Sequence, residues 1–267
     1  MARTFFILLL IWGSLWAVES FQVGSVTLFA VKDLDTNMGS AILLNKEGVS
    51  GSNQSSINAF LIVSGETAVL IDTGMNGELQ TNLKEIGYET DAIRQIVITH
   101  MHNDHIGGLI SEGRKNFSNA MVYLPENDLR FWRNSTPENK RAAEELKSVY
   151  GENLKTYGWG DQIFPFLQAV RADGHTPGHS AFLISSEGEK LLIVSDLIHF
   201  LAVQMADPTR AVVFDVDPQT AVSTRVRLLN LAANTKIPIA GMHIPYPGIG
   251  RVAKAVNGGF IFIPEGS

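Results

Sequence analysis

The chain has 267 residues, of which 45% are hydrophobic and 18% charged, so it can bury a large core and is not a disordered polypeptide. Acidic residues outnumber basic ones 27 to 21, and the resulting net charge of −6 argues against nucleic acid as a partner. The chain has no cysteine, which excludes disulfide bonds, thiolate nucleophiles and cysteine-bound metals.

The first twenty residues have the pattern of a secretory signal peptide. Arg3 precedes an apolar run from Phe5 to Val18, and Val18-Glu19-Ser20 resembles a cleavage site. A membrane anchor is the alternative, but a run of about 14 residues is shorter than the roughly 20 that span a bilayer. We therefore expect a secreted or periplasmic protein without stable membrane insertion, in which residues 21–267 form one domain.

The first half of this domain is predicted to consist mainly of strands. Its predicted strands, rich in β-branched and aromatic residues and separated by Gly, Asn and Ser, are 25–31, 40–44, 58–63 and 67–71. A helix is predicted over 77–86, and an apolar strand over 95–99 follows it. This last strand stops abruptly at a run of polar side chains that begins with His100.

The second half begins with a helical insertion and then returns to strands. Helices are predicted over 126–133 and 137–150, because both segments carry helix-forming residues. The second has Ser135 and Thr136 as candidate N-caps, and Pro137 suits its first turn. The remaining predicted elements are strands over 181–185 and 190–195, a helix over 218–233, and strands over 237–241 and 260–263. This order indicates an α/β protein with two sheets packed between layers of helices.

The polar run that follows the strand over 95–99 contains three imidazoles and one carboxylate, in the order His-x-His-x-Asp-His. Alternate residues of an extended segment point the same way, so His100 and His102 can bind one ion while Asp104 and His105, past a turn, bind a second. The flanking Gly107-Gly108 lets another part of the backbone pass close by. A solvated polar loop is the alternative. Imidazole and carboxylate ligands suit two divalent ions, Zn²⁺ first, with Mn, Fe or Co acceptable.

Two ions need more ligands than one loop offers, and the later sequence supplies them near predicted strand ends. The resulting sets are His100, His102 and His175 for the first ion, Asp104, His105 and His243 for the second, and Asp196 as a bridge. Each ion keeps a position for a shared hydroxide. Taken singly, the three later residues would more often be hydrogen-bonded structural histidines or a helix cap.

This constellation resembles the metallo-β-lactamase superfamily, and the resemblance spans nearly the whole mature chain. It implies a four-layer αββα sandwich with two mixed sheets inside helical layers. Asp72, in Asp-Thr-Gly, is similar to a superfamily carboxylate that orients the metal histidines, although a turn-forming aspartate is the alternative. His179 resembles a supporting histidine, with a bond to a nearby carbonyl as the alternative.

Within the superfamily the chain is most similar to the methyl parathion hydrolase-like and lactonase-like group. The segments that carry this similarity are 98–109, 174–179, Asp196-Leu197-Ile198 with Ala202-Val203-Gln204, and 243–250. The resemblance implies a hydrolase in which a metal-bridged hydroxide attacks a neutral lactone or aryl ester, with organophosphate triester hydrolysis as the alternative. A zinc β-lactamase and a non-catalytic metal-binding relative are lesser alternatives. A homodimer is implied by the resemblance alone.

Residues that could touch the substrate complete the candidate site. His199 lies where the related acyl-homoserine lactonases carry a tyrosine, and we hypothesise that it donates a hydrogen bond to the substrate, a helix-start histidine being the alternative. With Asp104 and Asp196 it forms the catalytic set. Phe131 and Trp132 resemble the aromatic pair that lines the pocket of the group, with packing of the helical insertion onto the sheet as the alternative for both. Phe200, Met205 and Tyr246 are further pocket candidates, with core packing as the alternative for each.

Overall fold

The computed structural model describes residues 19–45, 47–49, 51–256 and 258–265. The predicted signal peptide therefore lies outside the described residues except for Glu19 and Ser20, and Ser20 begins the first strand, β1 (Ser20–Val23). Within the described part, none of the helices combines the length and the apolar character needed to cross a membrane.

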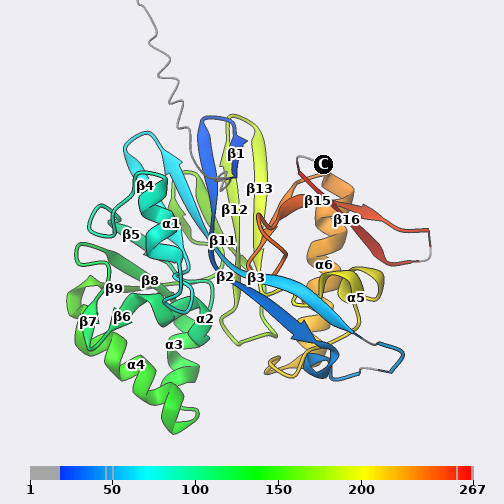
Figure 1. Ribbon diagram of the computed structural model, residues 1–267, viewed down its shortest axis with the longest axis horizontal. Helices are drawn as coiled ribbons and strands as arrows, with labels where there is room; N and C mark the ends of the chain where they lie inside the picture. Colours follow the sequence, from blue (N-terminus) through cyan, green and yellow to red (C-terminus); the bar gives the residue numbers. More distant parts are fainter. Residues whose placement is uncertain (1–18, 46, 50, 257, 266–267) are drawn as a thin grey trace, which may run out of the picture.

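Two mixed sheets, each of seven strands in the described part of the chain, form the centre of the fold (Figure 1). The first sheet has the order β1-β2-β3-β4-β5-β8-β9, and its further strands are β2 (Val26–Gly39), β3 (Ser52–Ser64), β4 (Thr67–Ile71), β5 (Gln95–Val97), β8 (Met121–Pro125) and β9 (Leu154–Tyr157). The second sheet has its strands in chain order, namely β10 (Gln162–Phe164), β11 (Leu167–Arg171), β12 (Ser180–Ser186), β13 (Glu189–Ser195), β14 (Ile239–Gly241), β15 (Ile249–Lys254) and β16 (Phe260–Pro264). A small ladder pairs β6 (Ile110–Ser111) with β7 (Arg114–Lys115).

Helices cover the outer face of each sheet (Figure 1). The first sheet carries α1 (Leu79–Glu85), α3 (Glu126–Arg133) and α4 (Pro137–Tyr150), and the second carries α5 (Leu201–Ala206) and α6 (Pro218–Thr235). Shorter helical turns are α2 (Asn103–Ile106), η1 (Ser40–Ile42), η2 (Gly107–Leu109) and η3 (Gly151–Asn153).

Strand periodicity explains the layers. In β3, Phe60 faces the core between the two sheets whereas Leu61 faces the core beneath α1, because successive side chains of a strand point to opposite faces. Phe182 of β12 lies in the same inner core, and Leu228 of α6 packs on the outer face of the second sheet. The predicted αββα sandwich is confirmed.

Local sequence signals predicted several elements with the observed bounds. Helix α4 begins as expected, because the side chain of Thr136 accepts a hydrogen bond from the N–H of Asn139 and Pro137 occupies the first turn. The prediction of a strand over 40–44 is wrong. Strand β2 pairs with β3 as far as Gly39, so the chain must reverse there, and residues Ser40–Ile42 form the turn η1.

Candidate metal centre

Most polar residues of the candidate site lie near the carboxyl ends of parallel strands in both sheets, whereas His175 lies in the loop between the antiparallel strands β11 and β12. Strands β4 and β5 run parallel, and Asp72 follows the first while His100 lies shortly after the second. Strands β13 and β14 also run parallel, and Asp196 and His243 follow them in the same way. Because carboxyl ends of parallel strands meet at one edge of a sheet, this topology brings residues distant in sequence to one place.

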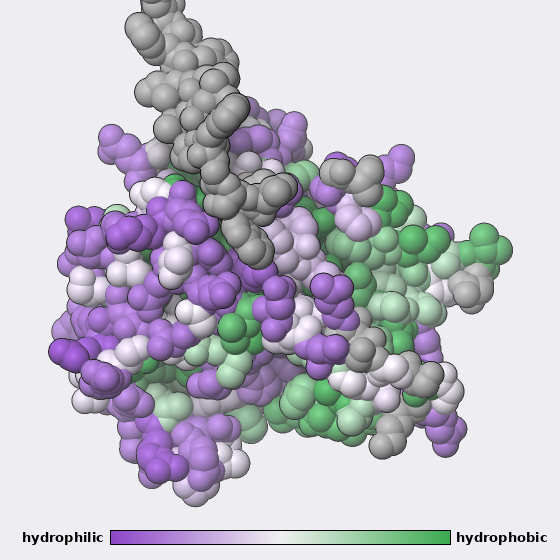
Figure 2. Space-filling view, viewed as in Figure 1, coloured by the Kyte–Doolittle hydropathy of each residue, from purple (hydrophilic) through white to green (hydrophobic). Residues whose placement is uncertain are grey.

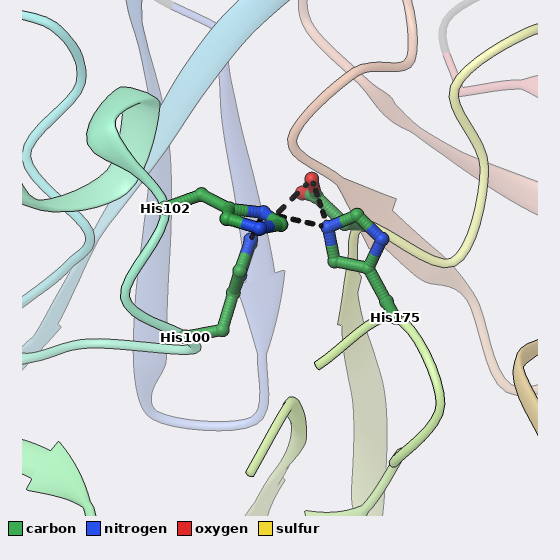
Figure 3. A group of neighbouring side chains, drawn as sticks. His100, His102 and His175 are labelled. Carbon is green, nitrogen blue, oxygen red and sulfur yellow. Dashed lines mark hydrogen bonds and ion pairs between the residues drawn. The ribbon is translucent and has the colours of Figure 1, made fainter. Parts of the chain in front are cut away.

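Three histidines converge in what we call the first group, His100, His102, His175 and Asp196, whose ligand atoms all lie within 4.8 Å of one another. Nδ1 of His102 lies 2.9 Å from Nε2 of His100 and 3.0 Å from Nε2 of His175, and Figure 3 shows the three rings pointing toward one another. Oδ2 of Asp196 lies 3.3 Å from Nε2 of His175.

The second group consists of Asp104, His105, Asp196 and His243, again with all ligand atoms within 4.8 Å. Nε2 of His243 lies 3.2 Å from Oδ2 of Asp104 and 3.0 Å from Oδ2 of Asp196. Nε2 of His105 lies 3.2 Å from Oδ1 of Asp196. Asp196 therefore belongs to both groups, and the structure brings together the seven ligands named from the sequence.

The donor atoms of both groups fit divalent cations. One imidazole nitrogen carries either one proton or one lone pair, so Nδ1 of His102 cannot satisfy both nitrogens beside it by hydrogen bonding. Nε2 of His105 is buried and has no partner of hydrogen-bond geometry among the described residues. Imidazole nitrogens and carboxylate oxygens that converge in this way can all bind one cation, and imidazole and carboxylate without thiolate suit Zn²⁺ or a similar ion.

The electrostatics of the groups point the same way. Burial, aided by the neighbouring His175, lowers the pKa of His102 to about 3, so near pH 7 its ring is neutral and has a lone pair to offer. Burial also disfavours the charged form of His243, but the carboxylates of Asp196 and Asp104 raise its pKa to about 10. The second group thus favours positive charge between its carboxylates, which a divalent cation supplies.

Asp72 orients His105. Its Oδ2 lies 2.6 Å from Nδ1 of His105, which turns Nε2 of that ring toward the second group. The carboxylate is itself held by the backbone N–H and the hydroxyl of Thr99, each at 2.7 Å. Asp72 has a φ of 62°, a left-handed conformation that aspartate tolerates better than most residues.

His179 lies outside both groups and supports Asp196 through the backbone. Its Nδ1 donates to the carbonyl of Ala172 at 2.7 Å, and its Nε2 accepts the N–H of Asp196 at 3.2 Å. Burial, aided by His175, lowers the pKa of His179 to about 3, so the ring is neutral and can play both roles. The alternative given for it, a bond to a carbonyl, and a supporting role are therefore both present.

Gln204 and Gly108, which lie in segments that resemble the family, shape the backbone around the site. Oε1 of Gln204 accepts the N–H groups of His199 at 2.7 Å and Phe200 at 3.0 Å, so Gln204 shapes the turn that follows Asp196. A Cβ at Gly108 would lie 2.0 Å from the carbonyl oxygen of Thr73, so the close backbone approach expected at this position is present.

Asp128 of α3, which sequence reasoning missed, connects the loops that carry three of the candidate ligands. Its buried carboxylate accepts the N–H of Met101 and the hydroxyl of Thr176, both at 2.9 Å, and also the N–H of Gly178. Burial raises its pKa to about 6. The only signal in the sequence is that Asp128 shares a helix face with Trp132, four residues later.

Replacing Asp128 with alanine is expected to lower the free energy of unfolding by about 3 kcal/mol or more, because each buried N–H left without an acceptor costs about 1–3 kcal/mol. Urea unfolding of the zinc-saturated protein measures this. Glu126→Ala, in the exposed first turn of the same helix, is the matched control and should change stability by less than about 0.5 kcal/mol. Equal stability of the two variants would show that Asp128 does not hold these loops.

A cavity of about 300 Å³ opens onto both groups. His102, Asp104, His175, Asp196, His199 and His243 line it together with Asn103, and Met38 of β2 and Phe214 form its apolar walls. The sequence had not indicated Met38 or Phe214, because an apolar side chain next to a turn carries no mark of its role.

The aromatic residues and Met205, named from the sequence as pocket candidates, lie elsewhere, and none of them lines this cavity. The Trp132 ring packs 5.5 Å from the His102 ring, and Phe131 packs on Trp132 at 5.4 Å. Phe200 is buried in a small cluster with Leu43 and Val212. The hydroxyl of Tyr246 donates to the carbonyl of Ala30 at 3.4 Å. Met205 is buried beneath the second sheet. For these side chains the structure shows the core or supporting contacts that were the alternative.

Comparison with known proteins gives one family match. Residues 53–238 match the family model described as the metallo-beta-lactamase superfamily. An N-acyl homoserine lactonase of Bacillus sp is 27% identical over 156 residues, which cover 48% of this chain and 58% of that protein. One of Bacillus cereus is 25% identical over 51% of this chain and 61% of its own length. The aligned part thus spans about three fifths of these curated relatives.

Solved structures match over nearly the whole chain, among them two hydrolases. The crystal structure of hydrolase AbOPH in the beta lactamase superfamily has a TM-score of 0.84 and 29% identity, with 94% of this chain and 98% of that chain covered. The dizinc quorum-quenching lactonase AidC, in complex with the product N-hexanoyl-L-homoserine, has a TM-score of 0.85 and 27% identity with the same coverage.

Proposed function

This chain belongs to the metallo-beta-lactamase superfamily. On that premise we propose that it is a hydrolase that opens neutral lactones with two divalent metal ions, of which zinc is the first candidate. The observation that carries the proposal is that seven histidine and aspartate ligands form two groups that share Asp196 and face one cavity. The match to a dizinc lactonase over 94% of the chain supports the metal and the substrate class.

The residues have different roles according to the group in which they lie. The first group would hold one ion and the second group the other, with Asp196 between them. Two divalent ions supply a water-derived nucleophile at neutral pH and positive charge near the carbonyl oxygen of the substrate. Asp72 and His179 hold His105 and Asp196 in place, as their hydrogen bonds indicate.

The apolar walls of the cavity favour a neutral substrate with a hydrophobic part. Met38 and Phe214 can contact an acyl or aryl group while the carbonyl carbon lies over the metal groups. His199 also lines the cavity, and we assign it the role of a hydrogen-bond donor to the carbonyl or the leaving oxygen.

A substrate panel tests the proposal on one preparation with two zinc ions bound. We expect kcat/KM to be highest for acyl-homoserine or simple γ- and δ-lactones, lower for an aryl acetate, and lowest for a paraoxon-type phosphate triester and a chromogenic cephalosporin. Chelation of the metal should abolish every activity, and added Zn²⁺ or Mn²⁺ should restore it.

Each contrary result names another function. Highest activity on the phosphate triester would identify an organophosphate triesterase, and highest activity on the cephalosporin a zinc β-lactamase. Silence on all substrates with two ions bound would indicate a metal-binding protein that is not a hydrolase.

A further inference from the structure

One segment of the chain joins the apolar wall of the cavity to a histidine of the first group. Residues 211–217, which we call the wall segment, lie between α5 and α6. Phe214 lines the cavity, and its ring lies 6.2 Å from the ring of His199. The next residue, Asp215, turns inward, and its buried carboxylate lies 2.9 Å from Nδ1 of His175. Adjacent residues therefore face the cavity and the metal ligands.

Backbone hydrogen bonds attach the wall segment at both ends. They run from the N–H of Val216 to the carbonyl of His175 (3.0 Å), from Asp217 to Gly174 (2.9 Å), from Val213 to Ile42 (2.7 Å) and from Leu44 to Ala211 (3.0 Å). The segment thus bridges the His175 loop and the turn after β2. Outside the cavity the segment presents the half-exposed side chains of Val213 and Val216. In the view of Figure 2, apolar surface gathers on the right half of the molecule, where β15, β16 and α6 of Figure 1 lie.

The two oxygens of the Asp215 carboxylate bind different partners, one at the first group and one within the wall segment. Oδ1 accepts the Nδ1–H of His175, which leaves the Nε2 lone pair of that ring directed at the first group. Oδ2 accepts the N–H of Val212 at 2.9 Å, and the N–H of Asp215 donates to the carbonyl of Val212 at 3.1 Å. These last bonds close the turn that carries Phe214.

We propose that Asp215 is a positioning residue that fixes His175 toward the metal and Phe214 against the cavity at the same time, so that metal affinity of the first group and substrate selection depend on one carboxylate. The sequence gives no sign of this, because Asp215 lies 40 positions from its histidine.

Measurement of zinc binding tests the part of the proposal that concerns His175. Asp215→Asn keeps one acceptor oxygen, and its amide group must then face a donor, either Val212 N–H or His175 Nδ1–H. We expect one of the two zinc sites to weaken by about 10–100-fold and the other to stay unchanged, measured by competition with a chromogenic chelator. The visible spectrum of the cobalt-substituted variant should change in the bands of one site only.

Three further variants separate the possibilities. Asp217→Asn, two residues away, replaces one good N-cap of α6 by another and should leave both zinc sites intact. Phe214→Ala should raise KM for N-hexanoyl-L-homoserine lactone without changing zinc affinity. Asp215→Glu keeps a carboxylate and should weaken zinc binding less than Asp215→Asn does, which keeps the test informative if the asparagine variant does not fold.

The expected effect of Asp215 on substrate selection rests on the proposed function, whereas its expected effect on zinc affinity does not. At saturating zinc, Asp215→Asn should still show a raised KM for the same lactone. Unchanged zinc affinity in both Asp215 variants would overturn the inference whatever the activity, and weakened zinc affinity with an unchanged KM would overturn the link to Phe214. Weakened zinc affinity in a protein that hydrolyses no lactone would instead count against the proposed function and support the positioning of His175.

Discussion

Replacement of Asp196 with alanine is expected to lower kcat/KM for lactones by at least about 10³-fold, more than the roughly 10–100-fold typical of residues that only support a metal ligand. The reason is its place in both groups. Its oxygens lie 3.0 Å from Nε2 of His243, 3.2 Å from Nε2 of His105 and 3.3 Å from Nε2 of His175. Without it each group has only its three remaining ligands, and no negative charge lies between them.

Metal analysis distinguishes this cause from a general loss of structure. Bound zinc should fall from two ions per chain to one or fewer, while the circular dichroism spectrum keeps its native shape. Asp35→Ala is a suitable control, because Asp35 is an exposed aspartate of β2 that pairs with Lys32 and lies outside both groups. Asp196→Ala protein that retains two zinc ions and activity similar to that of the control would contradict the bridging role.

The second large effect is expected at His199. Its Nε2 lies 3.1 Å from Oδ2 of Asp196, and its side chain lines the cavity. Burial lowers its pKa to about 4, so near pH 7 the ring is neutral and has one N–H, which must leave the Asp196 carboxylate to donate to the substrate. Loss of a single donor to a developing negative charge costs about 100-fold or more. His199→Ala should therefore lower kcat/KM for lactones by about 100-fold with both zinc ions retained.

The comparison with His199→Gln tests whether donation is the cause. Glutamine keeps an N–H donor at similar reach, so it should recover part of the activity that alanine loses. Undiminished kcat/KM in His199→Ala with two ions bound would refute the role in substrate binding. Loss of zinc together with activity would assign His199 to the metal site instead.

Local patterns predicted the parts of the fold that depend on near neighbours. Helices α3 and α4 have the bounds predicted for them. For α4 the reason is local, because the N-cap at Thr136 and the proline after it act within one turn. The strand predicted over 40–44 failed because the long pairing of β2 with β3, rather than the β propensity of the residues, decides where the chain turns.

The site divides in a similar way. The sequence alone indicates the chemistry of the candidate metal centre, because His100, His102, Asp104 and His105 lie within six positions and the donor types restrict the ion. The tertiary structure alone decided which side chains position these ligands and which line the cavity. Asp128, Asp215 and Phe214 reach the site only when α3, the wall segment and both sheets have packed. An aromatic residue such as Phe200 buries its ring equally well in a core or in a pocket, so only the packed structure distinguishes the two.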